Sequence, residues 1–125
     1  MKYSVDKQDR YTLITLNEDN LNTVLAPDLK SKFIVFHNEG TKNLILDLSN
    51  VKFVDSSGLS AILTGNRLWK GESTFVLTGL VHQSVKKLIE ISKLNSVLNI
   101  IPTTKESIDY IMMEELERDL NREEE

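Results

Sequence analysis

The sequence of 125 residues contains no cysteine, only two prolines and a single tryptophan. The absence of cysteine excludes disulfides and thiolate chemistry. No apolar stretch of 18 residues is present, and the segment Met1 to Asp6 lacks the apolar core of a signal peptide. We therefore expect a cytoplasmic protein without direct membrane insertion. The length and the 40% share of apolar residues indicate a single domain over residues 1–125 with a core of ordinary size.

Charge is distributed unevenly along the chain. Residues 114–125 carry seven acidic side chains and two arginines, a net charge of −5, so the rest of the chain carries +1 of the total of −4. No stripe of basic and aromatic side chains occurs, which argues against nucleic acid as a partner. Negative charge at the end of a helix opposes its dipole, so we expect 114–125 to fray. This end could simply be solvated, contact a basic partner surface, or cover the face around Ser57.

Helical and extended stretches alternate through most of the chain. Two β-prone runs, 3–7 and 11–16, flank a short connection and predict a hairpin. The helices that we expect after it cover 27–39, 57–70, 81–93 and 103 to about 120, and the strands cover 43–48, 73–77 and 97–101. The order β-β-α-β-α-β-α-β-α predicts an α/β fold with about four helices and a mainly parallel or mixed central sheet.

Two polar positions have structural interpretations. Thr103 and Glu106 have the spacing of a capping box at the start of the last helix. Asp47 interrupts an apolar strand, and we expect its carboxylate to accept hydrogen bonds from nearby backbone N–H groups. Contact with a partner is the alternative for Asp47.

The segment Asp55-Ser56-Ser57-Gly58-Leu59 lies between an apolar strand and a helical stretch. This order puts a serine hydroxyl at a helix N-terminus, where free N–H groups and the helix dipole favour an anion. The serine could therefore accept and hold a phosphate. Asp55 could cap the helix or help to position the nucleotide or metal of a kinase. Glycine inside a helix costs about 1 kcal/mol relative to alanine, so Gly58 indicates a close approach at this point.

One face of the expected helix carries small side chains. Ser57, Ser60, Ala61 and Thr64 follow the spacing i, i+3, i+4, i+7, opposite an apolar face with Leu59 and Ile62. Small side chains would let a partner approach the helix backbone closely. A phosphate on Ser57 would add about −1.5 to −2 charges there, and the desolvation or repulsion of this charge could weaken a contact by about 100-fold or more.

Several kinds of site are not indicated. The nucleophile-elbow pattern Gly-x-Ser-x-Gly is absent, and we expect the two histidines, His37 and His82, to be surface or capping residues. Asp47 and Asp55 lack the further acidic and lysine residues of a receiver-type metal site. No glycine-rich phosphate loop, zinc spacing or dinucleotide fingerprint occurs. We therefore expect no enzyme activity, no catalytic residues, no metal site and no cofactor.

The chain resembles the STAS domain, the fold of bacterial anti-sigma factor antagonists, over roughly residues 3–113. The matching segments are 43–51, 53–59 and the lead-in to the last helix at 101–103. The resemblance implies that an anti-sigma factor, itself a serine kinase, phosphorylates Ser57, with Ser56 as the alternative acceptor. It also implies that the unphosphorylated form binds this kinase and releases a sigma factor, and that a PP2C-type phosphatase reverses the modification. The partner would contact the start of the helix, at Asp55, Ser56, Ser57, Gly58, Ser60, Ala61 and Thr64.

A second function is compatible with the same resemblance. STAS domains also occur as accessory subunits of lipid-transport ABC systems and in stress-signalling assemblies. There the same helix can be a docking face without a phosphorylation cycle. The Asp-Ser-Ser-Gly turn favours the phosphorylation switch.

Overall fold

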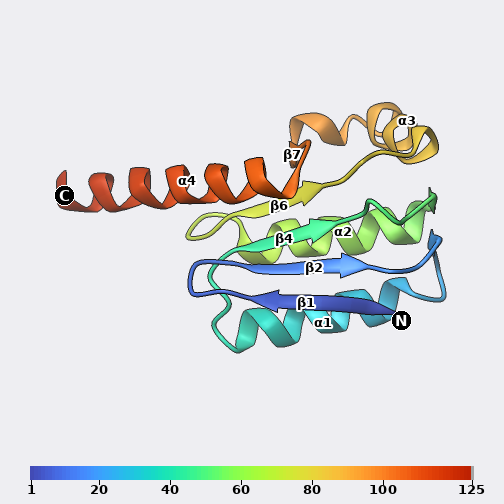
Figure 1. The fold of residues 1–125 in the computed structure, drawn as a ribbon, viewed down its shortest axis with the longest axis horizontal. Helices are drawn as coiled ribbons and strands as arrows, with labels where there is room; N and C mark the ends of the chain where they lie inside the picture. The colour runs from blue at the N-terminus through green and yellow to red at the C-terminus, as the bar shows by residue number, and fades with distance from the viewer. Residues whose placement is uncertain (125) are drawn as a thin grey trace.

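The computed structural model describes residues 1–124, which form a sheet in the order β1-β2-β4-β6-β7 with helices on both faces (Figure 1). β1 and β2 pair antiparallel as the predicted hairpin, and the other neighbours pair parallel. The elements are β1 (Tyr3–Lys7), β2 (Thr12–Leu16), β3 (Asn20–Leu21), α1 (Ala26–Asn38), β4 (Leu44–Asp47), β5 (Phe53–Val54), α2 (Ser56–Trp69), β6 (Phe75–Thr78), α3 (Gln83–Ile91), the 3-10 helix η1 (Leu94–Ser96), β7 (Asn99–Ile101) and α4 (Thr104–Glu124). The predicted fold class, an α/β fold with a mixed sheet and four α-helices, is confirmed.

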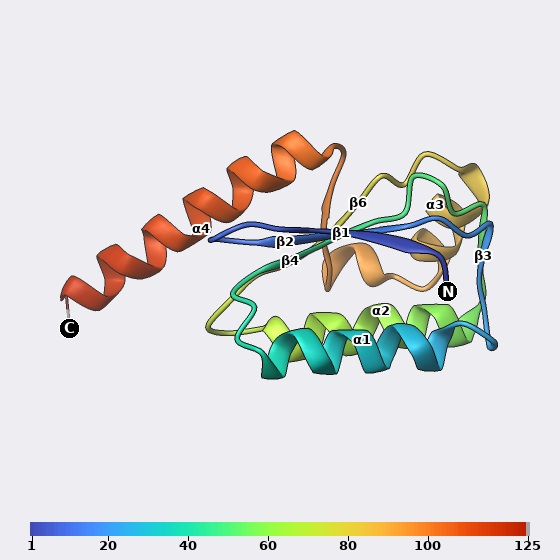
Figure 2. The ribbon, with the colours of Figure 1, turned by 60° about the horizontal axis from the view of Figure 1, so that its bottom comes forward.

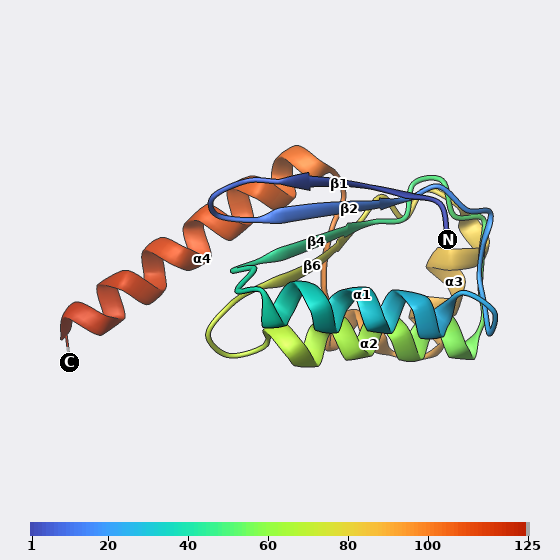
Figure 3. The same cartoon turned by 90° about the horizontal axis from the view of Figure 1, so that it is seen from below.

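One face of the sheet is covered by α1 and α2, which lie side by side (Figures 2 and 3). The apolar stripe predicted for α1 is buried there, at Leu29, Phe33 and Phe36. The ring of Phe33 meets those of Trp69 and Phe75 edge-on, with centroid distances of 5.9 and 5.7 Å. Such edge-on pairs add to the stabilisation that apolar burial gives. This face therefore contains the main core.

Within residues 1–124, only α4 covers the opposite face, and its C-terminal half projects beyond the strands (Figures 2 and 3). Its core is small, with Ile45, Val76 and Ile111 fully buried. The predicted capping box starts α4. The Thr103 hydroxyl accepts from the Glu106 N–H at 3.1 Å, and the Glu106 carboxylate meets the same hydroxyl, also at 3.1 Å, rather than the Thr103 backbone.

Some element boundaries differ from those predicted. α4 continues to Glu124, four residues beyond the expected end at Leu120. Arg122 in its last turn complements the helix dipole and pairs with Asp119 at 3.4 Å, and both effects favour the longer helix. The strand expected at 97–101 is shorter because η1 precedes it. Among residues 1–124, no helix is long and apolar enough to cross a membrane.

Candidate functional site at the start of α2

Asp55 is the N-cap residue of α2. Its backbone is extended, and its Oδ1 accepts a hydrogen bond from the Gly58 N–H at 2.9 Å. The bond satisfies one of the N–H groups that a helix leaves free in its first turn. The helix-capping interpretation of Asp55 is therefore confirmed.

The same carboxylate binds a segment that lies far away in the sequence. β3 pairs parallel with β5 and brings Thr23 to the start of α2. Asp55 Oδ2 accepts from the Thr23 N–H at 3.2 Å and from its hydroxyl at 3.4 Å. The hydrogen bond from Gly58, the largest cause, and the weaker ones from Thr23 and Ser57 lower the pKa of Asp55 below its usual value, against a smaller opposing effect of desolvation. Asp55 is therefore a fixed negative charge at neutral pH.

Ser57 lies in the first turn of α2 and is half-buried. Its Oγ is 3.1 Å from the Thr23 Oγ1, and either hydroxyl can donate. Both side chains line a hollow of about 270 Å³ between the first turns of α1 and α2, together with Ala26, Pro27, Lys30, Ser56 and Ser60. The hydroxyl of Ser57 is therefore held by a neighbour and still borders solvent-accessible space.

The small-residue face of α2 is only partly available to a partner. Ser60 and Thr64 are half-buried, and Ser56 and Asp55 are exposed. Ala61, by contrast, is fully buried in the main core. A side chain inside the core has no surface to offer, so the structure contradicts the prediction that Ala61 contacts a partner.

Gly58 is also buried, and the close approach that it indicated is internal. A Cβ at this position would collide with the carbonyl oxygen of Leu21 and would lie 2.8 Å from the Val54 Cγ1. Glycine is thus needed so that α2 can start directly against β3 and β5. Gly58 shapes the site from inside the chain and offers no surface to a partner.

Asp47 lies near this edge of the sheet but outside the hollow. Its Oδ1 accepts from the Ser49 N–H at 2.9 Å, which confirms the structural interpretation. His82 occupies the N-cap position of α3, and His37, on α1, packs its ring edge-on against Trp69 at the end of α2. Within residues 1–124, no three His, Cys, Asp or Glu side chains are grouped so that they could hold a metal ion.

Sequence reasoning missed two residues of this site, Thr23 and Lys30. Thr23 is 34 positions before Ser57 and lies in an irregular segment after β3. Lys30 lines the hollow only because α1 packs alongside α2. No short-range pattern marks either residue, and only the tertiary arrangement shows their place.

Structural comparisons identify the same fold in proteins of low sequence identity. An anti-sigma factor antagonist from Mycobacterium paratuberculosis is 19% identical, with a TM-score of 0.80 over 89% of this chain and 93% of that one. The Bacillus cell fate determinant SpoIIAA in its phosphorylated form is 18% identical, with a TM-score of 0.66 over 88% and 99%. A sulfate transporter family protein from Wolinella succinogenes is 17% identical, with a TM-score of 0.68 over 81% and 84%.

A search of curated protein sequences finds no significant match. The family model of the STAS domain matches residues 2–107, which include every strand, the first three α-helices and the turn with Ser57. The chain therefore belongs to the STAS domain family.

Proposed function

We propose that this STAS domain is a cytoplasmic anti-sigma factor antagonist of bacterial transcription regulation, a binding module rather than an enzyme. Its unphosphorylated form binds an anti-sigma factor that is a serine kinase, and this binding releases a sigma factor. The observation that carries the proposal is the hydroxyl of Ser57, held at the N-terminus of α2 by Thr23 and bordering an open hollow. The fold shared with anti-sigma factor antagonists supports it.

The modification transfers the γ-phosphoryl group of ATP from the kinase to Ser57 Oγ. The new P–O bond replaces the bond to ADP, and a base of the kinase takes the hydroxyl proton. The product carries about −1.5 to −2 charges at pH 7. The helix N-terminus favours this charge, and Lys30 lines the same hollow. Asp55, which is anionic, opposes it.

The favourable effect of the helix N-terminus and the unfavourable effect of Asp55 oppose each other, so we expect the phosphate to leave the fold largely unchanged. The switch would then act through the contact surface of α2. Ser57, Ser60 and Thr64 lie along one side of α2 and are half-buried. A partner helix packed against them would have to desolvate the new charge or meet it with its own acids. Either cost weakens binding by about 100-fold or more. A PP2C-type phosphatase hydrolyses the phosphoester and restores binding.

The direct test is incubation with the cognate anti-sigma factor kinase and ATP, followed by mass spectrometry of the intact protein and its peptides. We expect one phosphate, on Ser57. The Ser57→Ala variant should take none, and Ser56→Ala should be modified like the wild type. A phosphate on Ser56 alone would move the acceptor by one position. No phosphate at all would contradict the switch.

Calorimetry with the same kinase tests the electrostatic account. Ser57→Ala should bind like the wild type, and phosphorylated protein should bind about 100-fold more weakly. Ser57→Asp should lie between them because aspartate carries less charge than phosphate. Equal affinity of the phosphorylated and unphosphorylated proteins would contradict the proposal.

A docking subunit without a phosphorylation cycle is the second candidate, for example in a lipid-transport ABC system or a stress-signalling assembly. The observation in its favour is the structural match to the sulfate transporter family protein, whose TM-score of 0.68 is close to the 0.66 of phosphorylated SpoIIAA. It predicts stable binding to a permease or a scaffold protein with no effect of Ser57→Asp. The neighbouring genes would separate the two functions. A kinase and a phosphatase would indicate the switch, whereas a permease and an ATPase would indicate the docking subunit.

A further inference from the structure

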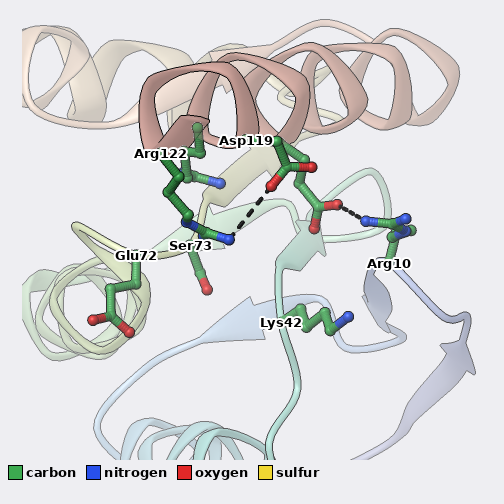
Figure 4. A pocket seen from close by; sticks show the side chains of 8 residues that line it. Arg10, Lys42, Glu72, Ser73, Asp119 and Arg122 are labelled. Carbon is green, nitrogen blue, oxygen red and sulfur yellow. Dashed lines mark hydrogen bonds and ion pairs between the residues drawn. The ribbon is translucent and has the colours of Figure 1, made fainter. Parts of the chain in front are cut away.

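The helix α4 has one side that holds it to the sheet. Ile111 on this side is fully buried against Ile45 and Val76. One turn further on, the Glu115 carboxylate pairs with Arg10 at 2.6 Å and accepts from the Asn43 side chain at 2.7 Å. Arg118 donates to the Thr74 hydroxyl. Figure 4 shows Arg10 reaching towards α4 in the cleft beside these contacts.

The other side of α4 carries an exposed apolar stripe. Met112, Met113, Leu116 and Leu120 are 40%, 65%, 53% and 52% exposed. At about 100° per residue, these four side chains occupy an arc of roughly 100°, turned away from the arc of Ile111 and Glu115. We call this set the α4 stripe. Leu116 and Leu120 lie on the C-terminal half of α4, which projects beyond the strands and has no other element beside it in the views (Figures 2 and 3).

The surroundings of the α4 stripe are acidic. Asp109, Glu117 and Glu123 lie on the same arc or next to it, by the same helical spacing. The two arginines of this half, Arg118 and Arg122, fall on the side of Ile111 and Glu115 instead. The α4 stripe is therefore an apolar strip bordered by negative charge.

We propose that the α4 stripe is the docking surface for a basic amphipathic helix of a partner protein. Leucines and other apolar residues of such a helix would cover the stripe, and its flanking lysines or arginines would meet the acidic border. The two methionines suit this role because their flexible thioether side chains adapt to different partners. The acidic border disfavours a second copy of this chain, since two such borders would face each other, and it also disfavours an anionic membrane.

This surface is separate from Ser57. α2 begins at the edge of the sheet near β3 and β5, whereas the C-terminal end of α4 lies beyond the opposite edge (Figure 2). A partner on the α4 stripe and a kinase on α2 could therefore bind at the same time. The surface would serve as a second, independent contact in an assembly.

The probe for the experiment is a synthetic helix of leucine and lysine, about 18 residues or five turns long, with leucines along one face. Its binding to the full chain is measured by fluorescence anisotropy. We expect Leu116→Lys to weaken binding about tenfold. The matched control is Val35→Lys, because Val35 is 49% exposed, close to the 53% of Leu116, and lies on α1, on the opposite face of the sheet from α4. It adds the same charge and should change the affinity less than twofold.

Three outcomes would overturn the proposal. Equal weakening by Leu116→Lys and Val35→Lys would show unspecific charge attraction. If a peptide with glutamates in place of the lysines binds the chain with the same affinity, the acidic border plays no role in binding. A dimer in sedimentation velocity that Leu116→Lys abolishes would identify a second copy as the occupant. If Leu116→Lys unfolds by circular dichroism, Met113→Lys at a more exposed position takes its place.

Discussion

The two faces of the sheet are covered to very different extents. On one face, α1 and α2 bury a continuous core with a cluster of three aromatic rings. On the other face, the apolar contact with α4 buries only three side chains completely within residues 1–124. Polar contacts, such as the ion pair of Glu115 with Arg10, provide the rest of the attachment of α4. The first face fixes the position of Ser57, whereas the second leaves most of a helix uncovered. The difference indicates that the well-packed face sets the geometry around Ser57, where we propose the switch, and that the sparsely packed face leaves the α4 stripe exposed for the docking that we propose.

The largest effect should come from truncation in the main core. We expect Phe33→Ala to lower the free energy of unfolding by about 3–5 kcal/mol, because Phe33 is fully buried and contacts two other rings. Ile111→Ala on the opposite face should cost about 2 kcal/mol, the lower end for such a truncation, because α4 can settle into the space. Urea denaturation of both variants measures the difference. Equal losses would show that the two faces stabilise the fold equally.

The contact of α2 with β3 should be sensitive to a single methyl group. Gly58→Ala places a Cβ against the Leu21 carbonyl, and we expect a loss of about 1–3 kcal/mol in spite of the better helix propensity of alanine. Ser56→Ala, at an exposed position two residues earlier, is the control and should change stability little. An unchanged or increased stability of Gly58→Ala would mean that β3 can move aside. The packing between α2 and β3 would then tolerate a larger side chain than the structure indicates.

The attachment of α4 should depend on its own cap. Thr103→Ala removes the acceptor for the Glu106 N–H, and we expect a loss of about 1 kcal/mol. Hydrogen exchange should rise in the first turn of α4 and stay unchanged in α2. The exposed neighbour Lys105→Ala serves as the control. Faster exchange in both helices would show that the two faces are more strongly coupled than their packing indicates.

The smallest effect should appear only as a dependence on pH. The folded-state pKa of Asp55 lies below its unfolded value of about 3.8, so its contribution to stability is present above that pH and is lost as the pH falls through the folded pKa. Asp55→Asn keeps an acceptor for Gly58 but has no charge. The wild type should therefore be more stable than Asp55→Asn at pH 7, and the difference should shrink as the pH falls below 3.8 and through the folded-state pKa. If the difference in the free energy of unfolding does not change with pH, the charge of Asp55 does not contribute to stability.

The sequence contained enough information for the fold because its signals were local. Pro27 and Gly40 bracket α1, the run 44–48 gave the central strand, and Thr103 with Glu106 gave the start of α4. The end of α4 was placed too early. The acidic composition disfavours helix at this end, but the spacing of Asp119 and Arg122 allows an ion pair that supports further helix.

Only the part of the candidate site that is local in the sequence could be predicted. Asp55 and Ser57 stand in one short turn, and their places at the N-terminus of α2 follow from the alternation of strand and helix. Thr23 and Lys30 join them from segments whose contact depends on the pairing of β3 with β5 and of α1 with α2. Ala61 was misjudged because helical spacing gives the direction of a side chain but not the identity of its neighbour.

The bond between Thr23 and Asp55 has a consequence for when Ser57 can be recognised. The two residues are 32 positions apart, so the arrangement exists only after β3 has paired with β5. A nascent or damaged chain shows the same five-residue motif without Thr23 beside it. An enzyme that requires the complete arrangement would therefore ignore immature molecules, and the modification would report correct maturation as well as signal state.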